Sequence, residues 1–437
     1  MQTPSVPRDL PIGLIACGGT LPREVADSIV RGGRRVFVVA VDEEADADFG
    51  TLPVVRVSWS KFGAAVAALR AAGVRDVLMV GRMTRPRLKD ARPDFGFIAA
   101  LPTVLKILTA GGDDALLRSV VALFEPRGFR VVGVADVAAD LLLSGGHLAG
   151  PAPSVSDQSD IELGMALIAA LGPFDIGQGA IVANGRVIAL EGAEGTDRMI
   201  ARVAAQRAGS DGSLAKRSGV LIKRAKPGQD VRLDLPTIGP DTVTAVDRAG
   251  LSGIAAQQGH VIVAHRAELM TEADRLGIFV VGVDGMTPHV EASLGLADVA
   301  AQHGALRNLS SSDRRDAGLG IAAMLSLLKF SSGCALVARR NRVISIGAHE
   351  SAFDVITRTY PARRGWMKSR TGVSVISGEE MLSPALLQAA ANIGLAAVIV
   401  MIGSGREPQS SQADLEVGQR YGLSIIEVAC ADFETAP

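Results

Sequence analysis

Residues 12–41, IGLIACGGTLPREVADSIVRGGRRVFVVAV, give the clearest indication of the fold in the first part of the chain. The apolar run Ile12–Cys17 predicts a buried strand, Arg23–Arg31 has helical spacing, and Arg35–Val41 predicts a second strand. Strands that alternate with helices are typical of a parallel sheet with crossover helices. The alternation continues to a strand expected at Val131–Val134, after a helix at Asp114–Phe124. We therefore predict an α/β fold that begins with a Rossmann-like domain over residues 10–150.

The next part of the chain, residues 151–283, has the same alternating pattern. Asp157 is the expected N-cap of a helix over Asp157–Ala170, and strands are expected at Gly179–Ala183 and Arg186–Leu190. Hydrophobic residues make up 48% of the chain and aromatic residues only 4%, which suits β-branched strands covered by alanine-rich helices. These features predict a second α/β domain that would carry the catalytic groups.

The last third of the chain, residues 284–437, resembles the second. Aligning Ser154 with Ser310 sets an offset of 156 residues that holds without a gap to Glu194 and Glu350, and 14 of these 41 positions are identical. Chance agreement between segments of similar composition is the alternative, but a single ungapped register favours a duplicated domain. We therefore predict a third α/β domain that is a degenerate copy of the second.

The copy retains scaffold positions and loses polar ones. Gln178, Glu191, Gly195, Thr196 and Asp197 are replaced by Cys334, Gly347, Ser351, Ala352 and Phe353. The copy is therefore expected to be catalytically empty. A tethered copy can occupy the place of a partner subunit, so a monomeric pseudo-dimer and a homodimer both stay open.

Composition and charge exclude several classes of function. The net charge of −1 offers no electrostatic basis for nucleic-acid binding. The three cysteines and six histidines are scattered, with no metal-ligand spacing. Residues 1–9 lack the pattern of a signal peptide, and no run reaches the roughly 20 apolar residues of a membrane span. We expect a cytoplasmic protein whose membrane contact is peripheral.

Two motifs of the first domain suit an anion. ACGGTLP, residues 16–22, joins the first strand to the first helix, where glycines and helix N–H groups favour phosphate. GRMTRP, residues 81–86, follows a later strand, and Arg82 and Arg85 have forked donors for phosphate oxygens. A tight turn without a ligand and a solvated loop are the structural alternatives.

Two motifs of the second domain carry charge. EGAEGTD, residues 191–197, groups three carboxylates at a strand-to-helix turn, which suits Mg²⁺ or Mn²⁺; alternatively, Asp197 is a first-turn acid and Thr196 an N-cap. The loop KPGQDVRLDLPTIGP, residues 226–240, places Asp234 between leucines, where a carboxylate needs a cation or donors. Lys223, Lys226 and Gln229 lie just upstream of Asp234, as a phosphate site requires.

Together the four motifs favour phosphoryl transfer or phosphoanhydride hydrolysis, in which catalysis is mostly positioning and charge stabilisation. No Walker loop, H-E-x-x-H or G-x-S-x-G motif appears. An NAD(P) oxidoreductase is the alternative enzyme, but the glycine spacing does not match G-x-G-x-x-G. A non-catalytic binding or regulatory protein is the alternative outside enzymes.

IACGGTLP, VGRMTRP, GGDDALLR, SVSDQSDIELG, DIGQGAIV, EGAEGTD, IKRAKPGQD and DLPTIGPDT follow one another in the order seen in the LpxI family, which the chain resembles over residues 10–283. Members of that family are UDP-2,3-diacylglucosamine pyrophosphatases of lipid A biosynthesis. The resemblance implies hydrolysis of a lipid-linked sugar nucleotide to UMP and 2,3-diacylglucosamine 1-phosphate. It also implies two α/β domains around the substrate, a divalent metal, and work at the cytoplasmic face of the inner membrane.

The resemblance also implies roles for individual residues. Asp234 matches the catalytic aspartate, and Lys226 and Thr237 are the other expected catalytic residues. Glu191, Asp197 and Asp234 are the expected metal ligands. The expected substrate-binding residues are Gly18, Gly19, Leu21, Pro22, Gly81, Arg82, Arg85, Gln178, Gly179, Glu194, Gly195, Thr196, Lys223 and Gln229. Whether Asp234 acts as metal ligand or as base stays open.

Overall fold

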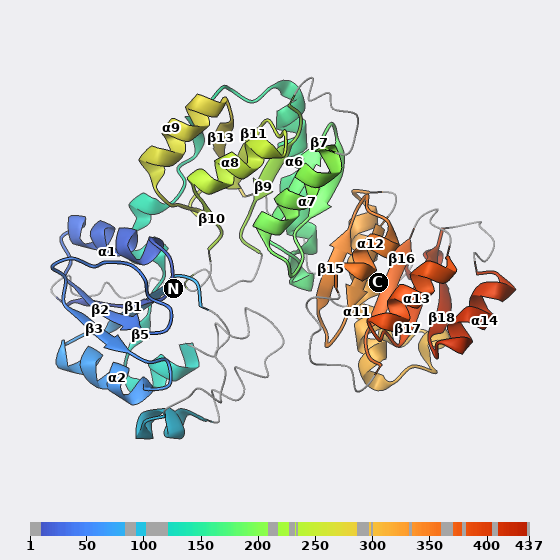
Figure 1. The fold of residues 1–437 in the computed structure, drawn as a ribbon, viewed down its shortest axis with the longest axis horizontal. Helices are drawn as coiled ribbons and strands as arrows, with labels where there is room; N and C mark the ends of the chain where they lie inside the picture. Colours follow the sequence, from blue (N-terminus) through green and yellow to red (C-terminus); the bar gives the residue numbers. More distant parts are fainter. Residues whose placement is uncertain are drawn as a thin grey trace. The chain divides into compact units, whose positions relative to one another are not determined.

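The computed structural model describes residues 10–83, 93–101, 121–208, 217–226, 232, 235–285, 297–298, 300–331, 334–359, 370–377, 382–403 and 410–434 (Figure 1). The chain forms two compact units. The first comprises Met1–Gly145, Gln229–Pro240 and Gln258–Leu269, and the second comprises Gly146–Gly228, Asp241–Gln257 and Met270–Pro437. Strands and helices alternate in both, which confirms the α/β fold.

The first unit is built on a five-stranded parallel sheet of order β3-β2-β1-β4-β5. Its strands are β1 (Ile12–Ala16), β2 (Val36–Val41), β3 (Val54–Val57), β4 (Asp76–Val80) and β5 (Arg130–Val131), and its helices include α1 (Leu21–Arg31), α2 (Phe62–Ala71) and α5 (Val134–Val137). Two apolar clusters, one on each side of the sheet residues, form the core. Helix α1 begins earlier than expected because Pro22 is well suited to a helix start.

The prediction of a strand over Val131–Val134 is wrong beyond Val131. Strand β5 ends at Val131, and Val134 begins the short helix α5. The carboxylate of Asp136 accepts the N–H of Gly133 at 2.8 Å, which caps the helix and ends the extended run. Of the helix expected over residues 114–124, only 121–124 are described, and they are helical.

A small parallel pair also belongs to the first unit. β10 (Thr237–Ile238) pairs with β12 (Ile262–Val263), and Ile262 bridges to Leu142. Helix α9 (Arg266–Leu276) follows this pair along the chain.

The second unit contains a six-stranded sheet of order β6-β13-β11-β9-β7-β8. Its strands are β6 (Gly146–Ala149), β7 (Gly179–Ala183), β8 (Arg186–Leu190), β9 (Val220–Lys223), β11 (Gly253–Gln257) and β13 (Phe279–Val283), with helices α6 (Val155–Leu171), α7 (Thr196–Ala208) and α8 (Pro240–Arg248). β9, β11 and β13 are parallel, whereas β7 is antiparallel to both of its neighbours. The sheet is therefore mixed rather than wholly parallel.

The expected N-cap of α6 is corrected by three residues. Ser154, not Asp157, caps the helix: its hydroxyl accepts the N–H of Asp157, whose carboxylate in turn accepts the N–H of Ser154. This reciprocal capping box makes Asp157 the third residue of the helix.

A second sheet of the same unit has the order β15-β14-β16-β17-β18. Its strands are β14 (Cys334–Ala338), β15 (Val343–Gly347), β16 (Val373–Ser377), β17 (Ala397–Ile402) and β18 (Ser424–Ala429), with helices α11 (Ser311–Leu328), α12 (Ala352–Thr357), α13 (Pro384–Asn392), α14 (Gln412–Arg420) and α15 (Ala431–Glu434). Helix α6 packs against α11, and β8 contacts β15. Among the described residues, no helix is long and apolar enough to cross a membrane.

Candidate active site

Three of the predicted site segments meet at one edge of the six-stranded sheet. Gly179, the first residue of β7, is in register with Lys223, the last residue of β9. The antiparallel β8 ends at the same edge, so that Glu191 directly follows it and donates its N–H to the carbonyl of Gly179 at 2.9 Å. The mixed sheet therefore brings together residues from three segments distant in sequence.

A chain of polar contacts connects these segments. The Nζ of Lys223 donates to the Oγ1 of Thr196 at 2.6 Å, and this hydroxyl donates to the Oε2 of Glu191 at 2.8 Å. The same carboxylate oxygen lies 3.9 Å from the Lys223 ammonium. Lys223 is only 5% exposed, so its charge acts in surroundings that water screens weakly.

Glycines leave the space that the Glu191 carboxylate occupies. A Cβ on Gly179 would lie 2.5 Å from its Oε2, and a Cβ on Gly177 would lie 2.1 Å from its carbonyl oxygen. Gly195, just before α7, has a φ of +84°, a conformation that suits glycine. The glycines of this motif thus set the position of Glu191.

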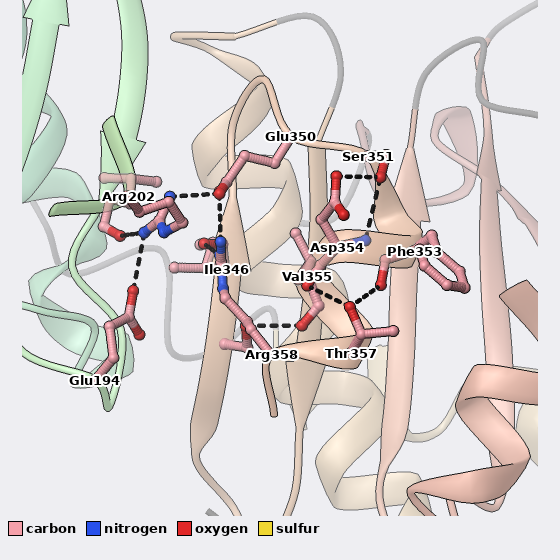
Figure 2. A network of polar contacts seen from close by, with 12 residues as sticks. Glu194, Arg202, Ile346, Glu350, Ser351, Phe353, Asp354, Val355, Thr357 and Arg358 are labelled. Atoms are coloured by element: carbon pink, nitrogen blue, oxygen red, sulfur yellow. Dashed lines mark hydrogen bonds and ion pairs between the residues drawn. The ribbon is translucent and has the colours of Figure 1, made fainter. Parts of the chain in front are cut away.

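The other two carboxylates of the motif have different surroundings. The Oε1 of Glu194 accepts from Arg202 at 2.9 Å (Figure 2). Asp197 is exposed in the first turn of α7. Thr196 is the first residue of that helix rather than its N-cap, and its hydroxyl contacts Glu191 and Lys223.

Lys226, three residues beyond β9, has its own carboxylate partner. Its Nζ donates to the Oδ1 of Asp175 at 2.6 Å. Asp175 has a φ of 55°, which turns the chain just before Gln178 and β7. Gln178 accepts the backbone N–H of Arg224 at 2.9 Å, which extends the contact between β7 and β9 beyond the strands.

Several predicted residues are not tested by this geometry. Asp234, Gln229 and Arg85 lie outside the described residues. Thr237 begins β10 and is exposed, and its hydroxyl donates to the carbonyl of Leu235 at 3.4 Å.

The two predicted motifs of the first unit do meet. Gly18 and Arg82 exchange two backbone hydrogen bonds, of 2.8 and 2.9 Å. Gly81 has a φ of +108°, and a Cβ there would lie 2.7 Å from the Gly18 carbonyl oxygen. The N–H of Gly19 donates to Asp46 at 2.7 Å, while Leu21 and Pro22 begin α1.

His265 is a polar residue at this turn that the sequence analysis did not single out. Its Nε2 lies 2.8 Å from the Thr20 hydroxyl and 3.1 Å from the Oε1 of Glu24. The backbone N–H of His265 donates to the Oε2 of Glu24 at 2.8 Å. A lone histidine 245 residues from Thr20 carries no sequence signal, because only the fold brings the two together.

The described residues include no group of three or more His, Cys, Asp or Glu side chains placed to hold a metal ion. Glu191 and Asp197 are described, and their hard oxygen donors fit the chemistry of Mg²⁺. Glu191 also lies 3.9 Å from Lys223, so a cation for phosphate oxygens stands beside a carboxylate for a metal ion.

A mixed α/β sheet with lysines, carboxylates and glycines at one edge is typical of enzymes that act on phosphate-bearing ligands. Residues 11–141 match the LpxI N-terminal domain, and residues 144–281 match the LpxI C-terminal domain. The UDP-2,3-diacylglucosamine pyrophosphatase LpxI of Caulobacter vibrioides is 39% identical over 273 residues, which cover 62% of this chain and 97% of that protein. The chain therefore belongs to the LpxI family, as the motifs indicated.

A solved structure, the murein peptide ligase of Psychrobacter arcticus, aligns with 97% of this chain and 92% of its own. Its sequence identity is 12% and its TM-score is 0.20, so the alignment carries no argument about fold or function.

Proposed function

We propose that the protein hydrolyses the diphosphate of UDP-2,3-diacylglucosamine to UMP and 2,3-diacylglucosamine 1-phosphate in lipid A biosynthesis. Support comes from membership of the LpxI family and from the activity for which the Caulobacter relative is named, since nearly all of that protein is matched. The strand order 3-2-1-4-5 of the first parallel sheet supports a Rossmann-like domain.

The observation that carries the proposal is the contact chain Lys223–Thr196–Glu191. The buried ammonium of Lys223 is a preformed donor for a phosphate oxygen, and the Thr196 hydroxyl lies beside it at the N-terminus of α7. A helix of this length presents free N–H groups at its first turn, where negative charge is favoured. Charge that develops on the diphosphate during bond cleavage is thereby stabilised by groups already in place.

Asp234 acts as metal ligand or general base. As base, it accepts a proton from a water molecule whose oxygen attacks one phosphorus of the diphosphate. The bridging P–O bond breaks, its electron pair stays on the departing phosphate, and two phosphate monoesters result. Lys226 holds phosphate charge, and Thr237 positions the loop that carries Asp234.

Mg²⁺ or Mn²⁺ is the proposed metal, held by Glu191, Asp197 and Asp234. When bound, it would neutralise charge on the diphosphate. Gly18, Gly19, Gly81 and Arg82 are proposed to bind the substrate, as are Gln178, Gly179 and Glu194. Because the substrate carries two acyl chains, we place the protein at the cytoplasmic face of the inner membrane, held there through its substrate.

We also propose that the C-terminal third is a degenerate copy of the second domain. Read from opposite ends, the orders β13-β11-β9-β7-β8 and β18-β17-β16-β14-β15 match strand for strand, including which pairs are antiparallel. Helices α6 and α11 are capped by Ser154 and Ser310, 156 residues apart. These correspondences support the register found in the sequence.

The experiment is release of UMP from UDP-2,3-diacylglucosamine by the purified full-length chain, with Mg²⁺ and with a chelator. Metal-dependent release that disappears in Asp234→Ala would support both reaction and site. Absence of release from a folded protein, together with tight substrate binding, would overturn the proposal in favour of a binding protein. Release that persists with chelator would retain the reaction and remove the metal.

A further inference from the structure

The C-terminal segment, residues 300–434, shares a core with the domain that carries the candidate site. Helix α6 packs on α11, and apolar side chains of both, such as Met165 and Met324, belong to one continuous cluster. Contacts between the segment and the candidate site therefore act from a fixed frame rather than from a loose tail.

One ion-pair chain connects this segment to the carboxylate motif (Figure 2). The guanidinium of Arg202 in α7 donates to Glu350 of the segment. It also donates to Glu194 at 2.9 Å and to the carbonyl of Leu190 at 3.4 Å. Arg202 thereby ties both ends of the stretch that contains Glu191 to a carboxylate outside the domain.

Glu350 is a buried residue of the C-terminal segment whose carboxylate accepts from arginine side chains. Its side chain is 2% exposed, and Arg358, the first residue after α12, also donates to it. A buried carboxylate needs such partners, because removing a charge from water is costly. A Cβ on Gly347 would lie 2.8 Å from the Oε2 of Glu350. The position that corresponds to Glu191 must therefore be small for Glu350 to take this place.

A second chain reaches the lysine of the candidate site. Arg342, beside β15, lies 3.7 Å from the Oδ2 of Asp175. The other oxygen of Asp175 accepts from Lys226 at 2.6 Å. The carboxylate of Asp175 thus joins Arg342 of the segment to Lys226, which is proposed to hold phosphate.

The offset of 156 residues shows how these contacts relate to the two domains. Glu350 aligns with Glu194, and Arg358 aligns with Arg202, so Arg202 contacts one carboxylate from each domain. The reverse ion pair, from Arg186 to the copy, is not possible, because Ser331 stands where the second domain has Asp175.

We propose that the C-terminal segment is a built-in positioning subunit, in which Glu350 and Arg342 hold the Glu191–Asp197 motif and Lys226 in place for turnover. The inference rests on the proposed hydrolase function. Neither residue is a catalytic residue, since each acts through a neighbour, Arg202 or Asp175. Misplacement of reacting groups by about 1 Å is enough to slow turnover by orders of magnitude.

The test compares Glu350→Gln and Arg342→Gln with Glu427→Gln in the full-length chain. Glu427 is the matched control, because it lies on β18 at the far edge of the second sheet and accepts from Ser410. We expect kcat for UMP release to fall about tenfold in each of the first two variants, with a smaller change in KM. The control is expected to keep both values.

A double-mutant cycle separates positioning from general damage. In the Glu194→Gln background, Glu350→Gln is expected to lower kcat less than twofold, because the carboxylate on which it acts through Arg202 has already lost its charge. Additive losses would overturn the inference, and so would wild-type kinetics in both Glu350→Gln and Arg342→Gln. If Glu350→Gln does not fold, Arg342→Gln, at a partly exposed pair, decides the matter. A wild-type chain that releases no UMP fails the proposed function instead.

Discussion

Asp160 and Asp316, 156 residues apart, hold two hairpin turns in the same way. The carboxylate of Asp160 accepts the N–H groups of Asn184 and Gly185, at 2.9 and 2.6 Å. That of Asp316 accepts the N–H groups of Arg340 and Asn341, at 3.1 and 2.6 Å. In each hairpin both turn residues have positive φ, which is the geometry of a type I′ turn.

The second hairpin holds this turn with less suitable residues. Asn-Gly is the favoured pair for two positive φ values, whereas Arg340 at φ 54° carries the steric cost of a left-handed conformation. Replacing Arg340-Asn341 by Asn-Gly should stabilise the chain by about 1 kcal/mol. Chemical denaturation of both proteins measures this difference in the free energy of unfolding. Replacing Asn184-Gly185 by Arg-Asn should lower the free energy of unfolding. A rise in that free energy would contradict this explanation.

The Thr196 hydroxyl is expected to be necessary for turnover. Thr196→Val keeps the shape of the side chain and removes the group between Lys223 and Glu191, whereas Thr196→Ser keeps the hydroxyl. We expect UMP release to fall about a hundredfold in the valine variant, because Lys223 and Glu191 lose the hydroxyl that holds them in place. The serine variant should retain most of the rate. Equal rates in all three proteins would remove Thr196 from the site.

Activity is expected to require glycine at position 177, because a side chain there would collide with Glu191. A Cβ at this position would lie 2.1 Å from the carbonyl oxygen of Glu191, so Gly177→Ala must displace the chain there. Gly304→Ala is the control, since a Cβ at Gly304 meets nothing within 4 Å. UMP release should fall at least tenfold in the first variant and stay unchanged in the second. Unchanged kinetics in Gly177→Ala would show that the position of Glu191 does not matter.

The thiol of Cys17, the residue directly after β1, makes the free energy of unfolding depend on pH. Burial, with a smaller contribution from the charge of Glu44, raises the pKa of its thiol from 9.0 to about 11. In the unfolded chain the thiol ionises near its ordinary pKa, so its contribution to stability is complete below pH 9 and disappears as the pH rises through 11. The difference in unfolding free energy between wild type and Cys17→Ala should therefore shift against wild type across this window. A constant difference would contradict the raised pKa.

Local features of the fold were predictable from the sequence. Strands Gly179–Ala183 and Arg186–Leu190 have the predicted bounds, because apolar alternation and flanking turn residues act within a few positions. The misplaced features are also local, but they depend on competition. Asp157 and Ser154 both suit a cap, and the reciprocal bonds between them decide for Ser154. Val134 suits a strand, but the Asp136 side chain favours a helix start.

The candidate site was predictable as residues but not as an arrangement. The motif EGAEGTD indicated three carboxylates for one ligand, yet the structure turns Glu191 toward Lys223 and Glu194 toward Arg202. Nothing in the motif distinguishes these carboxylates, because their partners come from β9 and α7. His265 was missed for the same reason, since its neighbours Thr20 and Glu24 lie more than 200 residues away in sequence.

The alternation of strands and helices, the glycine turns and the motif order of the LpxI family can all be read from the amino-acid sequence, since each depends on neighbouring residues. The folded chain was needed to show that β7 runs antiparallel between β8 and β9, and so that Glu191, Thr196 and Lys223 meet at one edge. It was also needed to show that Glu350 reaches Arg202. Charges attract across space rather than along the chain, so their pairing follows from strand order and helix packing.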